Sequence, residues 1–306
     1  MTKSLEITES FTPDGMPYVT VRGVYPFDAE ATFTCGQCFR FDPAVAPYPS
    51  IFGTDTVYGG VAMGRYINVS SPDLDTVVIE GTTADDFEAI WSGYFGFDMD
   101  YSGIIDSVDR RYGCESRIAV AAHAGRGIRI LRQDPWEALC SFIISQNNNI
   151  PRIKGIIERL CAAYGVPFVV RGEEKYAFPT ARVLYEAGVD GIAVARMGFR
   201  AKYVAGAAER VTFDTEFIEH VKNAVYDDAD AALQGLTGVG PKVSSCTLLF
   251  GFCRYEAFPV DVWIKRTVGK YFDGKPDEID FGELAPYAGI LQQYIFNYER
   301  NLGGGE

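Results

Sequence analysis

The sequence has no long hydrophobic run and no sign of a secretory signal. None of its 306 residues lies in an apolar stretch that approaches the roughly 20 positions a membrane-spanning helix needs. The first ten residues, MTKSLEITES, are polar. With 47% hydrophobic and 23% charged residues, the composition is that of a globular protein with room for two domains. We therefore expect a cytoplasmic protein, nucleoid-associated if it is bacterial, without a membrane partner.

Histidine is scarce, and the cysteines follow no metal-binding pattern. The chain has 2 histidines, His123 and His220, and 7 cysteines, an odd number. Cys35 and Cys38 form a lone CxxC pair with no second pair and no histidine at zinc spacing. No run of four cysteines in the C-terminal half would hold an iron–sulfur cluster. Reduced thiols without a metal are favoured, with a metal site at the CxxC as the alternative.

Positive charge is in short supply, with 28 Lys and Arg against 41 Asp and Glu and a net charge of −13. That total argues against a nucleic-acid partner, since such proteins present a basic face. The acid is concentrated in residues 1–125, which hold 7 Lys and Arg and 18 Asp and Glu, whereas residues 126–306 hold 21 and 23. The second part is therefore free to present a local basic face.

The spacing of apolar residues divides the chain in two. Segments 16–25, 64–71 and 75–81 are short and rich in β-branched and aromatic residues, and turn signals such as Pro13-Asp14-Gly15 and Gly59-Gly60 are expected between strands. From about residue 84 the apolar residues follow helical spacing. An antiparallel sheet with one or two helices is therefore predicted ahead of a helical domain.

Residues that favour helix ends mark several helices in the second part. Thr83, Asp134-Pro135 and Thr180 are predicted to begin helices, the first and last as N-caps and the middle pair as cap and first residue. Pro151 is predicted to open another helix, and Gly165 to close it in the C′ position.

The segment LTGVGPK connects two predicted helices, residues 227–235 and 241–253. Gly238 and Gly240 permit positive φ or close approach of another backbone, and Val239 would pin the hairpin by packing. The amides at the start of the second helix would suit a phosphate. The glycines alone favour a plain turn between packed helices.

Lys242 and Asp261 make a catalytic role more attractive. Lys242 is in the first turn of the predicted second helix, where the helix dipole disfavours a cation and so favours the neutral amine that a nucleophile needs. Asp261 precedes the next predicted helix, where a capping carboxylate is held rigidly and can face the lysine. The alternatives are an exposed lysine that touches phosphate or solvent and a plain N-cap.

The pattern L-x-G-V-G-x-K followed by P-V-D resembles the signature of helix-hairpin-helix DNA glycosylases that carry a lysine. Four more blocks resemble their 8-oxoguanine branch, namely residues 36–40, 141–165, 198–204 and 286–296. The resemblance implies an α+β fold, in which a TATA-binding-protein-like antiparallel sheet domain, residues 1–125, precedes an all-α helix-hairpin-helix (HhH-GPD) catalytic domain, residues 126–306. It also implies a monomer whose partner is double-stranded DNA that contains oxidised guanine.

The resemblance implies a bifunctional glycosylase and AP lyase without a metal or organic cofactor. Lys242 would attack C1′ of the damaged nucleotide and form a Schiff base, Asp261 would stabilise positive charge at the sugar, and β-elimination would cleave the strand. Gly36 would offer its carbonyl to the N7–H of 8-oxoguanine. The base would be held further by Cys246 and Phe296 on its faces and by Gln292 at its Watson–Crick edge; without the resemblance, Cys246 and Phe296 fit helix core.

The resemblance also assigns residues around the vacated site. Asn147, Arg152 and Arg200 would surround the opposite cytosine, Phe199 would be the wedge, and Gly238, Val239 and Gly240 would grip phosphate. Without the resemblance, the asparagines 147–149 suit a loop or a cap.

Two positions depart from the family pattern. Trp263 stands where animal and fungal members carry a phosphate-contacting histidine, and Phe199 where a tyrosine is usual. We expect altered affinity without loss of catalysis. The alternative functions are a lysine-bearing glycosylase for another lesion, which the Gly36 block disfavours, and a DNA-binding protein without catalysis, which Lys242 and Asp261 disfavour.

Overall fold

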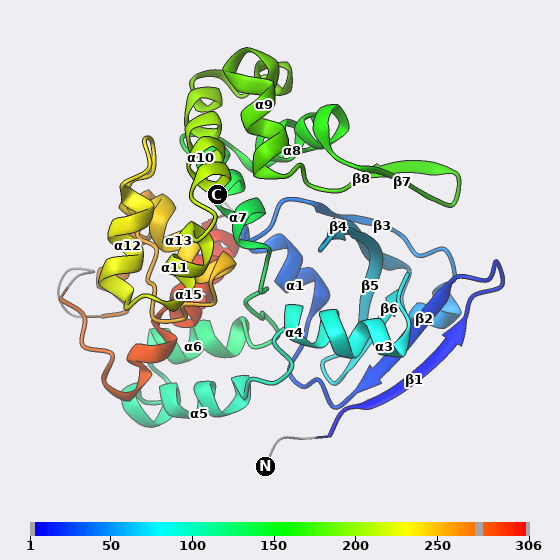
Figure 1. Cartoon of the computed structure of the whole chain (residues 1–306). Helices are drawn as coiled ribbons and strands as arrows, with labels where there is room; N and C mark the ends of the chain where they lie inside the picture. Colours follow the sequence, from blue (N-terminus) through cyan, green and yellow to red (C-terminus); the bar gives the residue numbers. More distant parts are fainter. Residues whose placement is uncertain (1–3, 273–277, 304–306) are drawn as a thin grey trace.

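A six-stranded antiparallel sheet lies beside a larger body of helices in the computed structural model, which describes residues 4–272 and 278–303 (Figure 1). The strand order is β1-β2-β6-β5-β4-β3. The strands are β1 (Glu6–Phe11), β2 (Pro17–Arg22), β3 (Phe41–Val45), β4 (Thr56–Ala62), β5 (Arg65–Asp73) and β6 (Thr76–Glu80). The three predicted strand segments became β2, β5 and β6, and the predicted turn at Pro13-Asp14-Gly15 joins β1 to β2.

One face of the sheet is buried under helices. Val19, Ile79 and Val69 lie side by side on β2, β6 and β5 and are fully buried. They pack in one core with aromatic side chains of the segment between residues 84 and 97, including Trp91. This segment contains α3 (Ala84–Asp86), a π-helical stretch (Phe87–Trp91) and α4 (Ser92–Tyr94), and Figure 1 shows it beside the sheet together with α1 (Ala29–Thr34). Thr83 caps α3 as predicted.

The prediction of a turn at Gly59-Gly60 was wrong, because both glycines lie inside β4. A Cβ atom on Gly59 would come within 2.4 Å of the Tyr66 hydroxyl on the neighbouring strand. On Gly60 it would come within 2.4 Å of the Arg40 carbonyl oxygen. These glycines therefore serve close packing against other segments, which is a second use of glycine in strands.

The helices of the second part begin where the capping residues predict. Asp134 accepts a hydrogen bond from the Glu137 amide and Thr180 one from the Val183 amide. Gly165 does follow its helix, but with an extended backbone (φ −76°, ψ 159°), and a Cβ there would meet the Ala177 carbonyl oxygen at 2.1 Å. The helices are α2 (Pro49–Phe52), α5 (Tyr101–Tyr112), α6 (Arg117–Ala124), α7 (Pro135–Ser145), α8 (Ile150–Tyr164), α9 (Ala181–Ile192), α10 (Ala201–Phe213), α11 (Phe217–Asn223), α12 (Tyr226–Gln234), α13 (Pro241–Gly251), α14 (Val262–Thr267) and α15 (Ala288–Gly303).

Two main hydrophobic cores underlie these layers. The sheet core contains residues from β2 to Phe95 together with Leu131, and the helical core gathers residues from α5 to α15. Cys35 and Phe39, which follow α1, belong to the helical core and so tie the sheet layer to it. The domain boundary at residue 125 stays a prediction. The helices α5 and α6 precede that residue in the chain, but their buried residues belong to the helical core. No helix in the described ranges has the length and apolarity needed to cross a bilayer.

A β-hairpin of β7 (Pro167–Val170) and β8 (Glu173–Tyr176) extends from α8 toward the sheet (Figure 1). Its two-residue loop, Arg171-Gly172, has positive φ at both positions, as a type I′ turn requires. The Arg171 guanidinium reaches back to Asp14 and to Glu80, at 2.7 Å each. The Glu80 side chain is only 2% exposed and depends on this partner and on Asn68.

We expect Arg171→Met to lower the free energy of unfolding by about 3 kcal/mol, because it strands the buried Glu80 carboxylate. Chemical denaturation followed by circular dichroism measures the change. Arg182→Met is the matched control, since its partner Glu186 is 59% exposed and such pairs contribute less than about 1 kcal/mol. Equal losses in the two variants would contradict the role of Arg171 as a buried clamp.

Candidate functional site

The hairpin between α12 and α13 has the tight geometry that the two glycines predict. Gly238 has φ 87°, and a Cβ there would lie 2.2 Å from the Tyr203 ring, so that only glycine fits without movement. Val239 is buried and its amide donates to the Leu236 carbonyl, which closes the turn. Gly240 is the N-cap of α13. The first helical turn that follows leaves backbone amides without partners inside the helix, as a phosphate site requires.

Lys242 and Asp261 line one pocket. Lys242 is the second residue of α13, and its ammonium nitrogen lies 5.3 Å from the centroid of the Phe142 ring. Asp261 is the N-cap of α14 and accepts a hydrogen bond from the Ile264 amide at 2.8 Å. The backbone therefore fixes the carboxylate, while the lysine side chain lies over an aromatic face. The structure thus brings the helix-start lysine and the capping aspartate to the same pocket.

Cys246 lies one turn along α13 from Lys242 on the same pocket wall. Burial raises the pKa of the Cys246 thiol, and the nearby Lys242 ammonium opposes that effect by charge and by a hydrogen bond. The negative charge of Asp261 also raises the pKa of the Cys246 thiol. Both Lys242 and Asp261 are therefore close enough to influence this thiol. The sulfur is thus a neutral thiol on a pocket wall that also carries a cation and an anion.

The other walls come from the segment after α1 and from α15. Gly36, Gln292 and Phe296 line the pocket, and a Cβ on Gly36 would be in ordinary contact with the Phe296 ring, at 3.6 Å. All four predicted base-contacting residues, including Cys246, therefore meet around one cavity. The rest of the lining was missed from the sequence and consists of Cys35, Phe142, Phe250, Pro259 and Gln293. Their apolar or amide character carries no motif of its own.

Two polar oxygens at this pocket have no hydrogen-bond donor within the described part of the chain. The carbonyls of Thr34, Cys35 and Gln37 each accept a side-chain hydrogen bond, but no described residue donates to the Gly36 carbonyl. The Oε1 atom of Gln292 is likewise buried without a partner among these residues. Buried polar atoms are nearly always paired, so the buried Gln292 oxygen indicates a ligand that carries an N–H group. The half-buried Gly36 carbonyl is open to a donor of the same kind.

The pocket opens into a groove of about 740 Å³. Asn147, Phe199 and Trp263 line the groove, and the side chains of Phe199 and Trp263 are half exposed. Lys265 stands beside Trp263 and provides a cation there. The predicted wedge, the opposite-base asparagine and the lysine-bearing pocket thus share one continuous surface.

The Arg200 side chain is bonded to the protein's own backbone and does not extend into the groove as a free group. Its guanidinium is buried and donates to the carbonyls of Gln146, Asn147 and Met197, so it holds the end of α7 and the asparagine loop. It also lies 4.5 Å from the centroid of the Phe199 ring. Burial lowers the pKa of Arg200. Its predicted contact with cytosine stays a prediction and would require the side chain to leave these carbonyls.

The asparagine segment divides its roles. Asn149 caps α8 by accepting a hydrogen bond from the Arg152 amide at 3.0 Å, as the cap interpretation predicts. Asn147 is exposed and has φ 46°, so its backbone is in the left-handed region. The Arg152 side chain is exposed. Asn147 and Arg152 are therefore accessible to a partner in the groove region.

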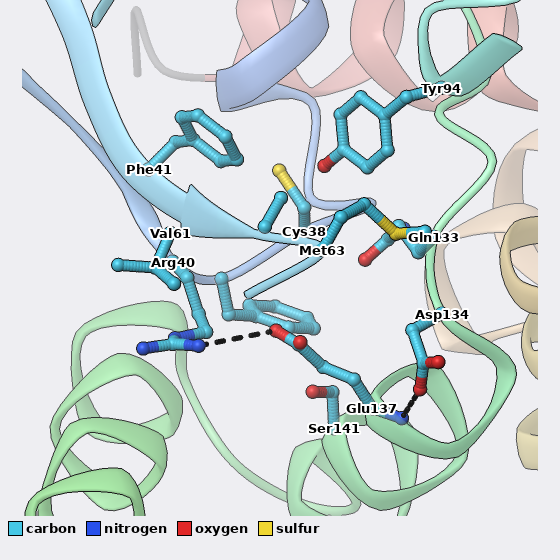
Figure 2. A pocket seen from close by; sticks show the side chains of 12 residues that line it. Cys38, Arg40, Phe41, Val61, Met63, Tyr94, Gln133, Asp134, Glu137 and Ser141 are labelled. Atoms are coloured by element: carbon cyan, nitrogen blue, oxygen red, sulfur yellow. Dashed lines mark hydrogen bonds and ion pairs between the residues drawn. The ribbon is translucent and has the colours of Figure 1, made fainter. Parts of the chain in front are cut away.

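A second cavity, of about 10 Å³, lies between the sheet and α7 (Figure 2). Cys38, Tyr94 and Gln133 surround it with Arg40 and Glu137, whose charged groups are 3.9 Å apart. It has room for about one water molecule and shares no residue with the pocket of Lys242. Burial raises the pKa of Glu137 to about 7, against the opposing effect of Arg40. This cluster belongs to the junction between the layers and not to a ligand site.

Two protein-family models match the chain in tandem. The model described as 8-oxoguanine DNA glycosylase, N-terminal domain, matches residues 21–139. The model described as HhH-GPD superfamily base excision DNA repair protein matches residues 140–280. An N-glycosylase/DNA lyase from Saccharomyces cerevisiae is 35% identical over 185 residues, which are 56% of this chain and 48% of the yeast protein. The match to that relative thus covers about half of its length.

Two other relatives match over nearly the whole chain. An N-glycosylase/DNA lyase from Arabidopsis thaliana is 30% identical over 292 residues, 87% of this chain and 75% of the plant protein. The 8-oxoguanine glycosylase/lyase of Clostridium acetobutylicum, solved with double-stranded DNA containing cytosine opposite 8-oxoguanine, is 33% identical with a TM-score of 0.86. That similarity covers 99% of this chain and 100% of the clostridial chain.

The sheet layer, the helical body and the glycine hairpin that carries Lys242 define a helix-hairpin-helix protein with a lysine in its pocket. The chain belongs to the 8-oxoguanine DNA glycosylase family of base-excision repair proteins.

We expect the stability of the protein to depend on pH through Glu137. The pKa of the Glu137 carboxyl is raised from 4.5 to about 7 in the folded chain. The stability that the protonated carboxyl contributes is therefore fully present below pH 4.5 and is lost as the pH rises through 7. Relative to wild type, Glu137→Gln should therefore gain up to about 3 kcal/mol of unfolding free energy between pH 5 and pH 8.

Denaturant titrations at a series of pH values measure this difference. Glu158→Gln is the control, since it removes another carboxylate beside Arg40 from a position that is 56% exposed. A Glu137→Gln difference that stays flat from pH 5 to pH 8, or that falls, would contradict the assignment.

Proposed function

We propose that this chain is a bifunctional DNA glycosylase and AP lyase that flips 8-oxoguanine out of duplex DNA, excises it through Lys242 and then cleaves the strand. One observation carries the proposal: a lysine and a fixed carboxylate line a pocket with Gly36 and Gln292, whose carbonyl and Oε1 oxygens accept no hydrogen bond from the described residues. Relatives that are named N-glycosylase/DNA lyase and 8-oxoguanine glycosylase/lyase support the same chemistry.

Recognition of the lesion would depend on the Gly36 carbonyl. 8-Oxoguanine carries an N7–H where guanine has a bare nitrogen, so only the oxidised base can donate to this oxygen. A buried carbonyl left without a partner costs about 1–3 kcal/mol, which disfavours guanine in the same pose. Gln292 would bond the Watson–Crick edge, and Phe296 and Cys246 would contact the two faces of the base. The base must leave the stack first, since its C1′ atom is out of reach inside the duplex.

The chemistry would begin with attack of the neutral Lys242 amine on C1′, while the bond from C1′ to the base nitrogen breaks. Positive charge develops at the sugar in this step, and the carboxylate of Asp261 would stabilise it from a position that its cap bond to Ile264 preorganises. Opening of the sugar ring gives a Schiff base between Lys242 and C1′. Loss of a C2′ proton then expels the 3′ phosphate by β-elimination, and hydrolysis of the imine frees the lysine.

Contacts with the DNA backbone and the vacated stack would come from the groove. The amides after Gly238 and Gly240 would bind phosphate at the start of α13. Phe199 and Asn147 line the groove, where Phe199 would occupy the gap left by the flipped base and Asn147 would lie on the side of the opposite base. The exposed Arg152 would join Asn147 there. Trp263 offers no charge where a histidine is usual in animal and fungal members, and Lys265 supplies a cation in the same groove.

Lys242→Gln should abolish the covalent complex that borohydride traps between wild-type protein and an 8-oxoguanine:cytosine duplex, because an amide cannot form a Schiff base. Gel electrophoresis of the trapped species measures it. Trapping by the variant at the wild-type level would remove Lys242 as the nucleophile. A panel of duplexes with other lesions separates the proposal from the two alternatives. Preferred trapping on another lesion points to a different glycosylase, and binding without trapping on any duplex points to a non-catalytic protein.

Asp261→Asn should bind the damaged duplex with nearly unchanged affinity and excise the base at least about 100-fold more slowly. The amide can still cap α14 through its oxygen but carries no charge for the sugar cation. Single-turnover rates and equilibrium binding measured in parallel test the two parts. An unchanged single-turnover rate would show that the carboxylate has no part in the chemistry.

A further inference from the structure

The loop that carries Gly36 is held on both sides of that glycine. On the N-terminal side, Nε2 of Gln293 donates to the Cys35 carbonyl at 2.9 Å. On the C-terminal side, Nε2 of Gln133 donates to the Gln37 carbonyl at 2.7 Å. The Gln37 side chain itself is buried and bonded to the backbone of Arg129 and Leu131. Gly36 is thus a single flexible residue between two anchored neighbours.

The anchor at Cys35 bears directly on where the Gly36 carbonyl points. The Cys35 carbonyl and the Gly36 amide belong to one peptide plane, which the bond from Gln293 restrains. The Gly36 carbonyl lies in the next plane, and φ and ψ of Gly36 set its direction relative to the first. Gly36 has φ 86° and, as a glycine, adopts many other backbone conformations at little cost. Without the bond from Gln293, the plane before Gly36 would lose its side-chain restraint while Gln37 stayed anchored, so the φ of Gly36 and the direction of its carbonyl would vary more widely.

Gln293 lines the pocket, and its amide nitrogen is engaged by the Cys35 carbonyl. Its side chain is 3% exposed, and it lies on α15 next to Gln292, whose free oxygen lines the same pocket. One turn of α15 therefore supplies both a group for the edge of the base and the anchor of the loop opposite. Lys242 and Asp261 stand on other elements, α13 and α14, and their positions do not depend on this bond.

We propose that Gln293 is a positioning residue for lesion recognition: it orients the Gly36 carbonyl toward the N7–H of the flipped base. This inference rests on the proposed function, in which that carbonyl reads 8-oxoguanine. It goes further because it attributes the orientation of the Gly36 carbonyl to the hydrogen bond from Gln293 to Cys35, whether or not Gln293 touches the base.

The test uses Gln293→Met, which keeps the length of the side chain and removes the donor. Single-turnover excision of 8-oxoguanine opposite cytosine should fall about tenfold, the effect of one lost hydrogen bond of ordinary strength. Strand cleavage at a preformed abasic site should stay within about twofold of wild type. An abasic site has no base to recognise, and it still requires Lys242 and Asp261. Loss of both rates together would reveal a merely structural role, and loss of neither would overturn the proposal.

Arg300→Met is the matched control. Arg300 lies two turns further along α15 and donates to the Thr34 carbonyl at 2.7 Å, so it anchors the same loop one peptide away from the Cys35–Gly36 plane. Its loss should leave both rates near wild type. A tenfold loss of excision in Arg300→Met as well would mean that any weakening of the loop suffices, and the specific role of Gln293 would fall.

A second substitution separates folding from recognition. Gln293→Glu has the shape of the natural side chain but sets an acceptor against the Cys35 carbonyl, so excision should fall at least as far as in Gln293→Met, with abasic cleavage preserved. Excision at the wild-type rate in Gln293→Glu would overturn the proposal. Failure of the proposed function itself looks different, because wild-type protein would then cleave the abasic duplex without excising 8-oxoguanine.

Discussion

The amide of Gln37 is the interaction on which the site most depends. This buried side chain donates to the backbone of Thr32 and Arg129 and accepts from the Leu131 amide, so it joins the segment after α1 to the strand-like segment that leads into α7. The sheet layer and the helical body meet at this point. Because each bond is buried, breaking one would leave an unpaired polar group, which costs more than an ordinary hydrogen bond gains. The segment that carries Gly36 is therefore attached directly to the junction.

The chemistry of the pocket is distributed over the ends of rigid elements. Lys242 stands in the first turn of α13, Asp261 caps α14, and Gly36 follows α1. Helix ends suit this purpose because they expose oriented backbone groups and hold capping side chains by hydrogen bonds. A carboxylate that caps a helix cannot move freely toward the lysine, so its charge stays available for the sugar. The acidic residues that dominate residues 1–125 lie mostly outside the groove, in which Lys242 and Lys265 are the basic side chains.

Local signals in the sequence were enough for much of the fold. The caps at Thr83, Asp134 and Thr180 occur as predicted, because a capping side chain bonds amides only three residues away. Gly59-Gly60 misled the same reasoning. The glycines are required by a tyrosine and a backbone that approach from other strands, and no local pattern carries that information. The domain boundary at residue 125, which stays a prediction, was drawn from position in the chain, whereas α6 packs against α15, far away in sequence.

The sequence by itself determined the hairpin, the lysine at the helix start and the aspartate at the next one, since each depends on spacing within a few residues. The family blocks added which distant residues to examine together. Only the tertiary structure decided that the Gly36 and Gln292 oxygens lack donors among the described residues, that Arg200 holds the asparagine loop from inside, and that Gln293 anchors the Gly36 loop. The bonds of Arg200 to Asn147 and of Gln293 to Cys35 join segments more than 50 residues apart. Such bonds leave no local periodicity, because they depend on how the finished helices and sheet meet.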